Sequence, residues 1–378
     1  MPEHVLITGG AGFIGSRLAA RFAGAGHRVT VLDLLLPQVH GDDPNVTSPL
    51  LRATEQVATV IRGSVTSADD LARSLEGVTV VVHLAAETGT GQSMYEISRY
   101  SQTNVGGTAN LLEQLAHRSH SVRRLIVAST RAVYGEGAYR AEDGTLVYPP
   151  ARAAASLAAG DFEVHAPGYG SLMVVPTSED AVLKPSSVYG ITKHAQESLV
   201  MTVAPTIGIE PLALRYQNVY GPGQSLKNPY TGILSIFSSL IRQGKEINVF
   251  EDGRESRDFV YVDDVVEATY RAAVVPEAAG QILNVGSGVG TTVLEVVAAL
   301  MEAYGVDVPV RISGNFRVGD IRHNIADTDR LCRVLGYVPT VAFRDGVRSF
   351  ADWVLTQPVE ADAYQRSLDE LAAHKLLG

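Results

Sequence analysis

Tyr189 and Lys193 stand four residues apart in a segment that begins at Ser187. On a helix this spacing puts both side chains on one face, one turn apart. An ammonium group beside a phenol stabilises the phenolate and lowers its pKa, so this tyrosine could take a proton from a hydroxyl group. Thr130, which follows an apolar run at residues 124–129, could orient that hydroxyl by a hydrogen bond. Taken alone, the pair could also be an ordinary exposed Tyr and Lys on a helix.

A glycine-rich turn near the N-terminus could bind a ligand that reacts together with these residues. The β-rich run 5–7 is followed by four glycines, a helical pattern from residue 16 and a second β-rich run that ends at Asp33. This order is typical of a βαβ unit that binds a dinucleotide, with the pyrophosphate at the helix N-terminus. Asp33 follows Gly15 by 18 residues and could hold ribose hydroxyls while repelling a 2′-phosphate, so NAD is favoured over NADP. The alternative is a glycine turn without a ligand. The glycines are Gly9, Gly10, Gly12 and Gly15.

The elements that must position these residues alternate along the first half of the chain. Residues 34–56 are rich in Pro, Gly, Asp and Ser and predict a loop with at most one short helix. His83, inside an apolar run, is interpreted as a hydrogen-bonded core histidine. Such alternation predicts an α/β fold, a doubly wound parallel sheet of the Rossmann type. The predicted strands are 57–61, 78–84, 124–129, 212–216, 247–250 and 281–285, and the predicted helices are 67–75, 103–117, 189–202, 233–242 and 292–304.

The alternation is interrupted at about residues 135–186, which predicts a functional loop or a small inserted subdomain. We therefore assign residues 1–215 to an NAD-binding Rossmann domain that contains this insertion. Residues 216–378 are assigned mainly to a smaller mixed α/β substrate-binding domain, with some segments returning to the Rossmann sheet. Ligands of such folds bind at the carboxyl ends of the strands, so we expect the active site between the two parts.

Composition narrows the classes of function. The net charge is −10 and no basic patch stands out, which argues against nucleic acid as a partner. No apolar run is long enough for a membrane span, and because the sequence enters a strand at once we expect no signal peptide. Cys332 is the single cysteine, so we expect no internal disulfide, no metal site and a cytoplasmic location.

Several motifs together make the chain resemble a known family, the extended short-chain dehydrogenase/reductases that act as NAD-dependent epimerases and dehydratases of nucleotide sugars. The resemblance covers nearly the whole chain, and within the family it is closest to dTDP-L-rhamnose 4-epimerase-like members. Its motifs are Thr8–Gly15, His83–Ala86, Asn104 and its neighbours, Tyr189-x-x-x-Lys193, Arg215–Pro222, Arg257–Asp264, Leu335–Tyr337 and Trp353.

The resemblance implies NAD as cofactor and a nucleotide sugar as substrate. It assigns the catalytic roles to Thr130, Tyr189 and Lys193. Asn218 would contact the substrate diphosphate, Arg257 the nucleotide end, and Arg317 or Arg322 the diphosphate. The substrate-binding set is Thr88, Thr130, Arg131, Asn218, Arg257 and Arg322. The cofactor-binding set is Gly9, Gly12, Phe13, Ile14, Gly15, Asp33, Ser64, Val65, Leu84, Ala85, Ala86, Asn104, Tyr189 and Lys193.

Departures from the family pattern narrow the reaction. Dehydratases carry Asp and Glu after the catalytic Thr, and decarboxylases keep a carboxylate there, whereas this chain has Arg131 and Ala132. Elimination is therefore disfavoured, and we expect 4-epimerisation of a nucleotide deoxysugar, with dTDP as the nucleotide, through a transient 4-ketone. The alternatives are a nucleotide-sugar 4-dehydrogenase or ketoreductase, a decarboxylase or dehydratase, and a non-catalytic NAD-binding protein.

Two further departures concern binding. A Cys-Pro-x-Cys-Gly element expected in this branch is replaced by Ala166–Gly170, and Ser64 stands where the family usually has an Asp that binds adenine. In this family the helices at 103–117 and 189–202 commonly pair across a two-fold axis, so we expect a homodimer.

Overall fold

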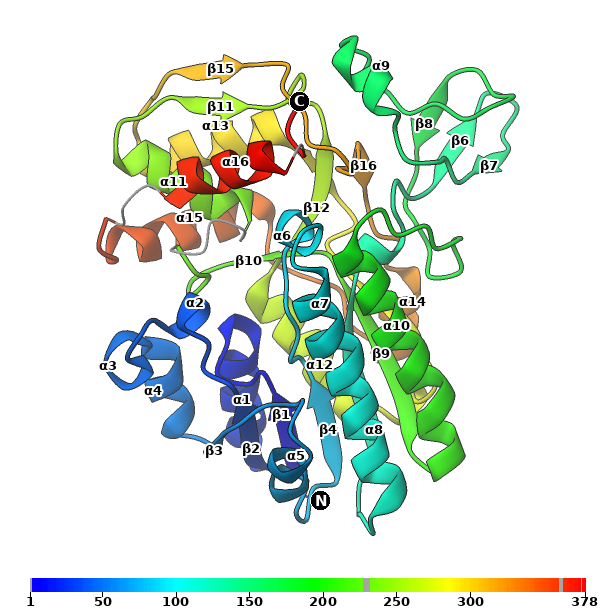
Figure 1. The fold of residues 1–378 in the computed structure, drawn as a ribbon, viewed down its shortest axis with the longest axis vertical. Helices are drawn as coiled ribbons and strands as arrows, with labels where there is room; N and C mark the ends of the chain where they lie inside the picture. The colour runs from blue at the N-terminus through cyan, green and yellow to red at the C-terminus, as the bar shows by residue number, and fades with distance from the viewer. Residues whose placement is uncertain (1, 227–231, 360–362, 375) are drawn as a thin grey trace.

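The computed structural model describes residues 2–226, 232–359, 363–374 and 376–378. Its centre is a sheet of seven strands, all parallel, in the order β13-β9-β5-β4-β1-β2-β3 (Figure 1). This confirms the predicted α/β fold with a doubly wound Rossmann sheet. The strands are β1 (His4–Thr8), β2 (Arg28–Asp33), β3 (Thr59–Arg62), β4 (Val80–His83), β5 (Arg124–Thr130), β9 (Glu210–Tyr216) and β13 (Ile282–Val285).

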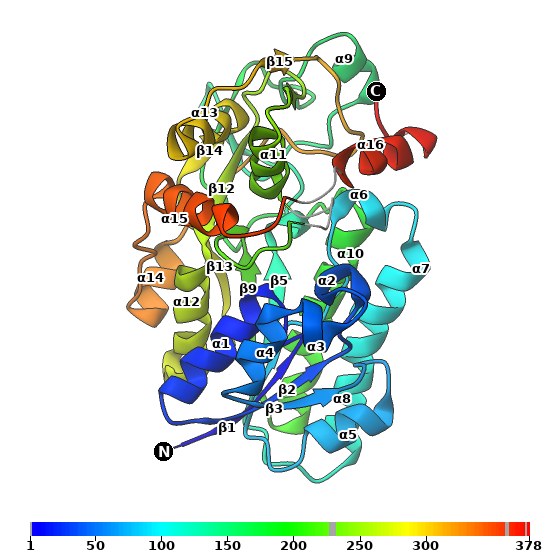
Figure 2. The ribbon, with the colours of Figure 1, turned by 90° about the vertical axis from the view of Figure 1, so that its left-hand side faces the viewer.

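Helices cover both faces of this sheet, which explains its continuous apolar runs (Figure 2). Side chains alternate along β1, so Val5 and Ile7 pack in one hydrophobic cluster and Leu6 in the other. The first cluster includes Phe22 and the second Leu111. The first face carries α1 (Phe13–Gly24), α4 (Pro49–Glu55) and α12 (Val262–Val274), and the other carries α5 (Ala68–Ser74), α8 (Gly107–His117) and α10 (Val188–Val203).

The structure differs from the predicted elements in two segments of this domain. Residues 34–56 form three short helices rather than a loop with one, and each begins at a proline, whose fixed φ suits the first helical position. The helix predicted from residue 103 starts as a π-helical turn, Ser101–Gly106, in which the buried Asn104 bonds to Glu87 and Thr192. Local periodicity could not predict that turn because these bonds join three separate elements. The additional helices are α2 (Pro37–His40), α3 (Pro44–Thr47), α6 (Thr90–Ser93) and α7 (Ile97–Tyr100).

Most of the C-terminal half forms a smaller mixed α/β part above the carboxyl ends of the sheet strands (Figure 1). β12 pairs with β10 and β16 in parallel and with β14 antiparallel, and β11 pairs with β15. β13 and α12 instead pack with the Rossmann sheet. The strands are β10 (Asn218–Tyr220), β11 (Ile247–Val249), β12 (Ser256–Tyr261), β14 (Gly290–Thr292), β15 (Val310–Ile312) and β16 (His323–Asn324). The helices are α11 (Ile233–Arg242), α13 (Val293–Tyr304), α14 (Asp329–Leu335), α15 (Phe343–Leu355) and α16 (Ala363–Ala373).

The segment that interrupts the alternation contains a small antiparallel sheet beside the C-terminal part (Figure 1). Its strands are short, and the buried side chain of Arg152 fixes the segment by ion pairs with Glu136 and Glu251. The structure thus shows a small inserted subdomain, one of the two predicted alternatives. It comprises β6 (Tyr139–Ala141), β7 (Leu146–Val147), β8 (Leu172–Val174) and α9 (Ala154–Ala158).

Within the described ranges, none of the helices combines the length and apolar character that a membrane crossing requires. The same residues contain no group of three or more His, Cys, Asp or Glu side chains placed to hold a metal ion. Cys332, on α14, is exposed.

Candidate active site

The glycine turn between β1 and α1 is built for close backbone contacts. Gly9 has φ +69°, and a Cβ there would lie 2.9 Å from the backbone N of Ala85. A Cβ at Gly15 would lie 2.5 Å from the Cα of Gly10, so α1 can approach the turn only because this residue is glycine. Asp33 braces the turn from the end of β2, where its carboxylate accepts the N–H of Ala11 at 3.0 Å.

This turn fits the pyrophosphate of a dinucleotide. Gly12 is the N-cap of α1 and provides no side-chain hydrogen bond to the first turn, so the helix N–H groups remain available to an anion. A Cβ at Gly12 would meet only the backbone O of Gly9, at 3.4 Å, which leaves open space in front of the turn. Phe13 and Ile14 then form part of the wall of the adjoining cavity.

A cavity of about 550 Å³ lies between the carboxyl ends of the sheet strands and the C-terminal part. It brings together residues predicted for all three roles. The predicted residues that line it are Phe13, Ile14, Leu84, Ala86, Thr88, Thr130, Arg131, Tyr189, Lys193, Asn218 and Arg257. The described lining also includes residues that sequence reasoning did not assign, among them Gln217, Asn248, Phe250, Glu251, Glu255 and Asp320.

Eight residues predicted to bind the cofactor lie outside the described lining of this cavity: Gly9, Gly12, Gly15, Asp33, Ser64, Val65, Ala85 and Asn104. The first four belong to the glycine turn and the carboxylate that braces it, and Ala85 lies against Gly9. Asn104 is fully buried, and its amide bonds to the backbone N and O of Glu87, so it shapes the loop that follows β4. Val65 is buried against Gly107. Ser64 donates its backbone N–H to Asp70, and its hydroxyl bonds to Thr66.

Thr130, Tyr189 and Lys193 meet in the cavity because β5 and the start of α10 are held close together. Ser187 caps α10 by accepting the N–H of Gly190 at 3.1 Å. A Cβ at Gly190 would lie 2.6 Å from the backbone O of Ala132, so the glycine permits the contact between α10 and the turn after Thr130. The structure thus confirms that Tyr189 and Lys193 lie on one helix beside Thr130.

The electrostatics of Tyr189 differ from the sequence-based expectation. Burial raises the pKa of its phenol, while the hydrogen bond with Thr130 and the positive charge of Arg131 lower it. The predicted lowering of this pKa by Lys193 is not found. The Lys193 ammonium instead donates to Gln196 Oε1 at 2.6 Å. Burial lowers the pKa of Lys193 itself to about 7, against an opposing influence of Glu197.

A buried ion pair near the predicted catalytic residues fixes α10 to the sheet. Glu197, four residues after Lys193, accepts from Arg215 Nη2 at 2.5 Å and from Ser129 Oγ at 2.6 Å. Arg215 also donates to the hydroxyl of Tyr134 at 2.9 Å. Glu197 was not assigned from the sequence. Its spacing of four from Lys193, which places both side chains on the same face of the helix, is the sequence signal that could have indicated it.

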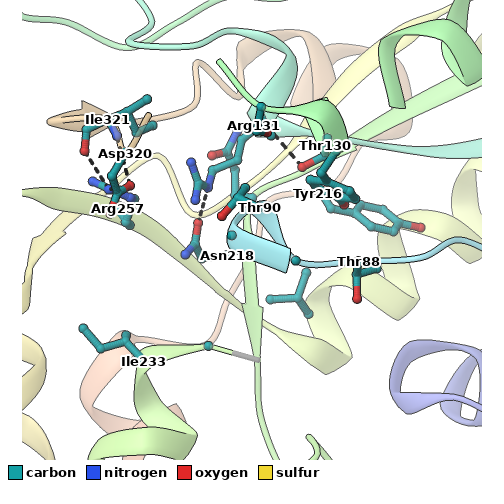
Figure 3. A pocket seen from close by; sticks show the side chains of 18 of the residues that line it. Thr88, Thr90, Thr130, Arg131, Tyr216, Asn218, Ile233, Arg257, Asp320 and Ile321 are labelled. Atoms are coloured by element: carbon teal, nitrogen blue, oxygen red, sulfur yellow. Dashed lines mark hydrogen bonds and ion pairs between the residues drawn. The ribbon is translucent and has the colours of Figure 1, made fainter. Parts of the chain in front are cut away.

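Two arginines predicted to bind substrate line the cavity in different ways (Figure 3). Arg131 points toward Asn218 and donates to its Oδ1 at 2.5 Å. Arg257 is held by the protein itself, since it donates to the carboxylate of Asp320 at 2.9 Å and to the backbone O of Ile321 at 2.7 Å. Arg131 therefore keeps donors for a ligand, whereas most of those of Arg257 are already used.

Arg322, predicted to bind substrate, is not brought to the cavity by the structure. Its side chain is 1% exposed, lies outside the described lining and pairs with Asp252, at 2.6 Å, and with Glu163 of the insertion, at 2.7 Å. Arg317, the other arginine of the same motif, does line the cavity and lies 4.8 Å from the ring centroid of Phe250. Arg322 is thus bound by acidic residues that are distant from it in sequence, and its side chain does not reach the cavity.

A Rossmann sheet with an open glycine turn, and a Thr–Tyr–Lys set beside it, defines an enzyme that uses a dinucleotide to act on a hydroxyl-bearing substrate. The family described as "NAD dependent epimerase/dehydratase family" matches residues 5–156 and 166–286. The chain belongs to this family and is an NAD-dependent nucleotide-sugar epimerase.

Individual relatives agree with this assignment. The chain is 38% identical over 355 residues to a dTDP-L-rhamnose 4-epimerase of Burkholderia thailandensis, covering 93% of this chain and 95% of the relative. It is 31% identical to a UDP-glucose 4-epimerase of Mycolicibacterium smegmatis, covering 91% and 96%. The UDP-glucuronic acid 4-epimerase of Bacillus cereus, solved with UDP-glucuronic acid and NAD, superposes with a TM-score of 0.76 at 25% identity, covering 93% and 99%. A dTDP-glucose 4,6-dehydratase and a nucleotide-sugar decarboxylase are also similar, so the comparisons do not fix the substrate.

Proposed function

We propose that this enzyme epimerises C4 of a dTDP-deoxysugar, dTDP-L-rhamnose or a close analogue, through a transient 4-ketone. The 38% identity to a dTDP-L-rhamnose 4-epimerase over nearly the whole chain supports the choice of substrate. The hydrogen-bonded Thr130–Tyr189 pair in the cavity supports chemistry at a hydroxyl group.

In this proposal Tyr189 takes the proton of the C4 hydroxyl, and Thr130 orients that hydroxyl by a hydrogen bond. The glycine turn and Asp33 would hold NAD, whose chemistry is reversible hydride transfer at C4. Epimerisation would require the transient ketone to turn over in the cavity before the hydride returns. Lys193 places a positive charge beside the site where negative charge develops. Tyr189 finally gives its proton back to the reduced C4 oxygen, so neither the enzyme nor the cofactor is consumed.

The observation that carries epimerisation rather than elimination is the turn after β5. It presents Arg131 and Ala132 to the cavity, where a dehydratase would need an acid and a base. The carboxylates in the described lining come from the C-terminal part instead, and Asp320 is paired with Arg257. Of the other two, Glu251 is paired with Arg152.

The charges of the cavity suggest where the diphosphate binds. No carboxylate forms an ion pair with Arg131 among the residues that the structure describes, and burial together with Arg257 lowers the pKa of Arg131 to about 10. An anion there would restore the stability of this cation. We assign the diphosphate to Arg131 and Asn218, with Arg317 and Phe250 on the side of the nucleotide.

The proposal also includes the predicted ligands of the two parts of the chain and the predicted homodimer. Residues 1–215 would bind NAD, residues 216–378 would bind most of the nucleotide sugar, and α8 and α10 would form a homodimer interface. Such an interface would cover Ile191 on α10, which is 54% exposed. A monomer in light scattering at micromolar concentration would contradict the dimer.

The test is proton NMR of the enzyme with dTDP-L-rhamnose in deuterated water, without added NAD. We expect a C4 epimer that keeps its C4 proton, because the hydride leaves and returns within one site. Deuterium at C3 or C5 would indicate enolisation and contradict the mechanism. Turnover only with stoichiometric NAD or NADH would favour a 4-dehydrogenase or ketoreductase. No reaction with this sugar, but epimerisation of UDP-glucose, would overturn the substrate alone.

A further inference from the structure

A chain of buried hydrogen bonds runs from Lys193 into the core. Lys193 Nζ donates to Gln196 Oε1 at 2.6 Å, and Gln196 Nε2 donates to Thr108 Oγ1 on α8 at 2.6 Å. His83 of β4 lies beside both, 3.0 Å from Thr108 Oγ1 and 3.3 Å from Gln196 Nε2. Gln196, Thr108 and His83 are fully buried, so none of these bonds can be exchanged for water without opening the core.

The donors and acceptors of this hydrogen-bond network allow one orientation of the Gln196 carboxamide. Thr108 gives its hydroxyl proton to the backbone O of Asn104 at 2.6 Å, so Oγ1 can only accept from Gln196. The amide nitrogen must therefore face Thr108, and the amide oxygen must face Lys193. In the flipped orientation an amide N–H would point at the ammonium and the oxygen would face an acceptor, with two buried hydrogen bonds lost.

The far end of the chain reaches the glycine turn. His83 Nδ1 lies 2.7 Å from Thr8 Oγ1, and Thr8 accepts the N–H of Ala85 at 3.2 Å. Burial lowers the pKa of His83 to about 3, so His83 is neutral at working pH. The hydrogen-bond network therefore contains a single charge, at Lys193. The orientation of Gln196 is thus set by β1, β4 and α8, independently of any ligand.

We propose that Gln196 is the positioning residue of Lys193: its amide oxygen holds one N–H of the buried ammonium, favours the protonated lysine and leaves the other two N–H groups directed toward the cavity. A hydrogen bond to the charged form of a group stabilises that form. The inference rests on the role that the proposed function gives to Lys193. It adds Gln196, which is fully buried and lies outside the described lining of the cavity.

The charged and titratable groups around Lys193 are few. Glu197 lies on the same helix, but it is paired with Arg215 of β9. His83 faces the lysine from β4 and is neutral. Tyr189 lies one turn before it on α10, and Arg131, in the turn after β5, acts on Tyr189. Gln196 is therefore the residue through which the protonation of Lys193 can be changed without adding or removing a neighbouring charge.

The experiment compares Gln196→Leu, Gln196→Glu, Lys193→Ala and the control Gln114→Leu, using kcat, KM and the pH profile of the purified enzyme with dTDP-L-rhamnose. The control Gln114→Leu makes the same Gln-to-Leu change on α8, outside the hydrogen-bond network. We expect Gln196→Leu to lower kcat about ten- to a hundredfold, the loss expected for a hydrogen bond to a charged group, with a much smaller change in KM. The alkaline limb should move to lower pH in Gln196→Leu and to higher pH in Gln196→Glu, which keeps an oxygen toward the ammonium and adds a negative charge.

Partial recovery of kcat by Gln196→Glu relative to Gln196→Leu, with Gln114→Leu unchanged, supports the inference. Circular dichroism and NAD binding establish that each variant is folded. An unchanged kcat and alkaline limb in Gln196→Leu, beside an inactive Lys193→Ala, overturns the inference and leaves the proposed function intact. Full turnover by Lys193→Ala overturns the role of Lys193 itself. If Gln196→Leu does not fold, a Gln196→Glu profile with the alkaline limb at or below that of the parent overturns the inference.

Discussion

Replacing Arg215 by Met should destabilise the enzyme strongly, because it leaves Glu197 charged and buried. The two side chains are 3% and 4% exposed and are joined by two bonds, of 2.5 and 3.0 Å. Removing one partner of a buried ion pair costs about 3–5 kcal/mol, since the remaining charge loses its compensation. The substitution also takes a donor from the Tyr134 hydroxyl and from the backbone O of Glu179. We therefore expect a loss of about 4 kcal/mol in the free energy of unfolding.

The measurement is equilibrium unfolding in urea, followed by far-UV circular dichroism and by the fluorescence of Trp353, the single tryptophan. The double variant Arg215→Met/Glu197→Gln removes both charges, so its cost should fall below the sum of the single costs by about 2 kcal/mol. Arg311→Met is the control, because its ion pair with Glu246 is 60% and 48% exposed and should be worth no more than about 1 kcal/mol. A loss below about 1 kcal/mol in Arg215→Met, or strictly additive costs in the cycle, would refute this reasoning.

Three further predictions test the site. Tyr189→Phe should lower turnover by about 10²–10⁴-fold while NAD remains bound, as read by stopped assays and by cofactor release on denaturation; parent-like turnover would contradict a proton-transfer role. Gly9→Ala should weaken NAD binding in calorimetry, because φ is +69° and the new Cβ would lie 2.9 Å from the backbone N of Ala85; unchanged affinity would show that the turn adapts. Burial raises the pKa of Glu255 to about 7 from 4.5, so its carboxylate costs stability as the pH rises from about 4.5 to 7. Glu255→Gln should therefore be more stable than the parent above pH 7, by up to about 3 kcal/mol, with no gain below about pH 4.5 in urea unfolding; an equal gain at both pH values would exclude this cause.

The central sheet could be predicted because its signals are local. A strand buried on both faces is a short continuous apolar run, and each run of this kind in the first half of the chain became a strand of the seven-stranded sheet. The predicted helix 67–75 is α5, and Ser67 caps it by accepting the N–H of Asp70. His83, interpreted as a core histidine, is buried and bonded on both ring nitrogens.

The insertion could not be predicted in detail because its structure is tertiary. Its strands have two or three residues each, too few for a periodic pattern. Arg152 pairs with Glu251, 99 residues later in the chain, and its side chain is 2% exposed. Only the assembled C-terminal part supplies the partner that holds this segment in place.

The meeting of the three predicted catalytic residues could be anticipated because each follows from one element: Thr130 ends a strand, and Tyr189 and Lys193 share a helix face. Gln196 was not, although it stands three residues after Lys193 on the same helix. Its role depends on Thr108 and His83, which come from two other elements and decide which end of the amide faces the lysine. Spacing brings the side chains together, but the proton given by Thr108 to Asn104 sets the direction of the bond.

The two arginines of the segment 317–322 show where sequence reasoning ends. Both were candidates for the diphosphate, and nothing within the segment separates them. Arg322 meets Asp252 and Glu163, which lie 70 and 159 residues away in sequence, and an arginine that is already paired offers less to a ligand. Arg317 lies over Phe250 and lines the cavity. Which of the two arginines lines the cavity is therefore decided by where the acidic residues of the rest of the chain fold, and the insertion contributes one of those residues, Glu163.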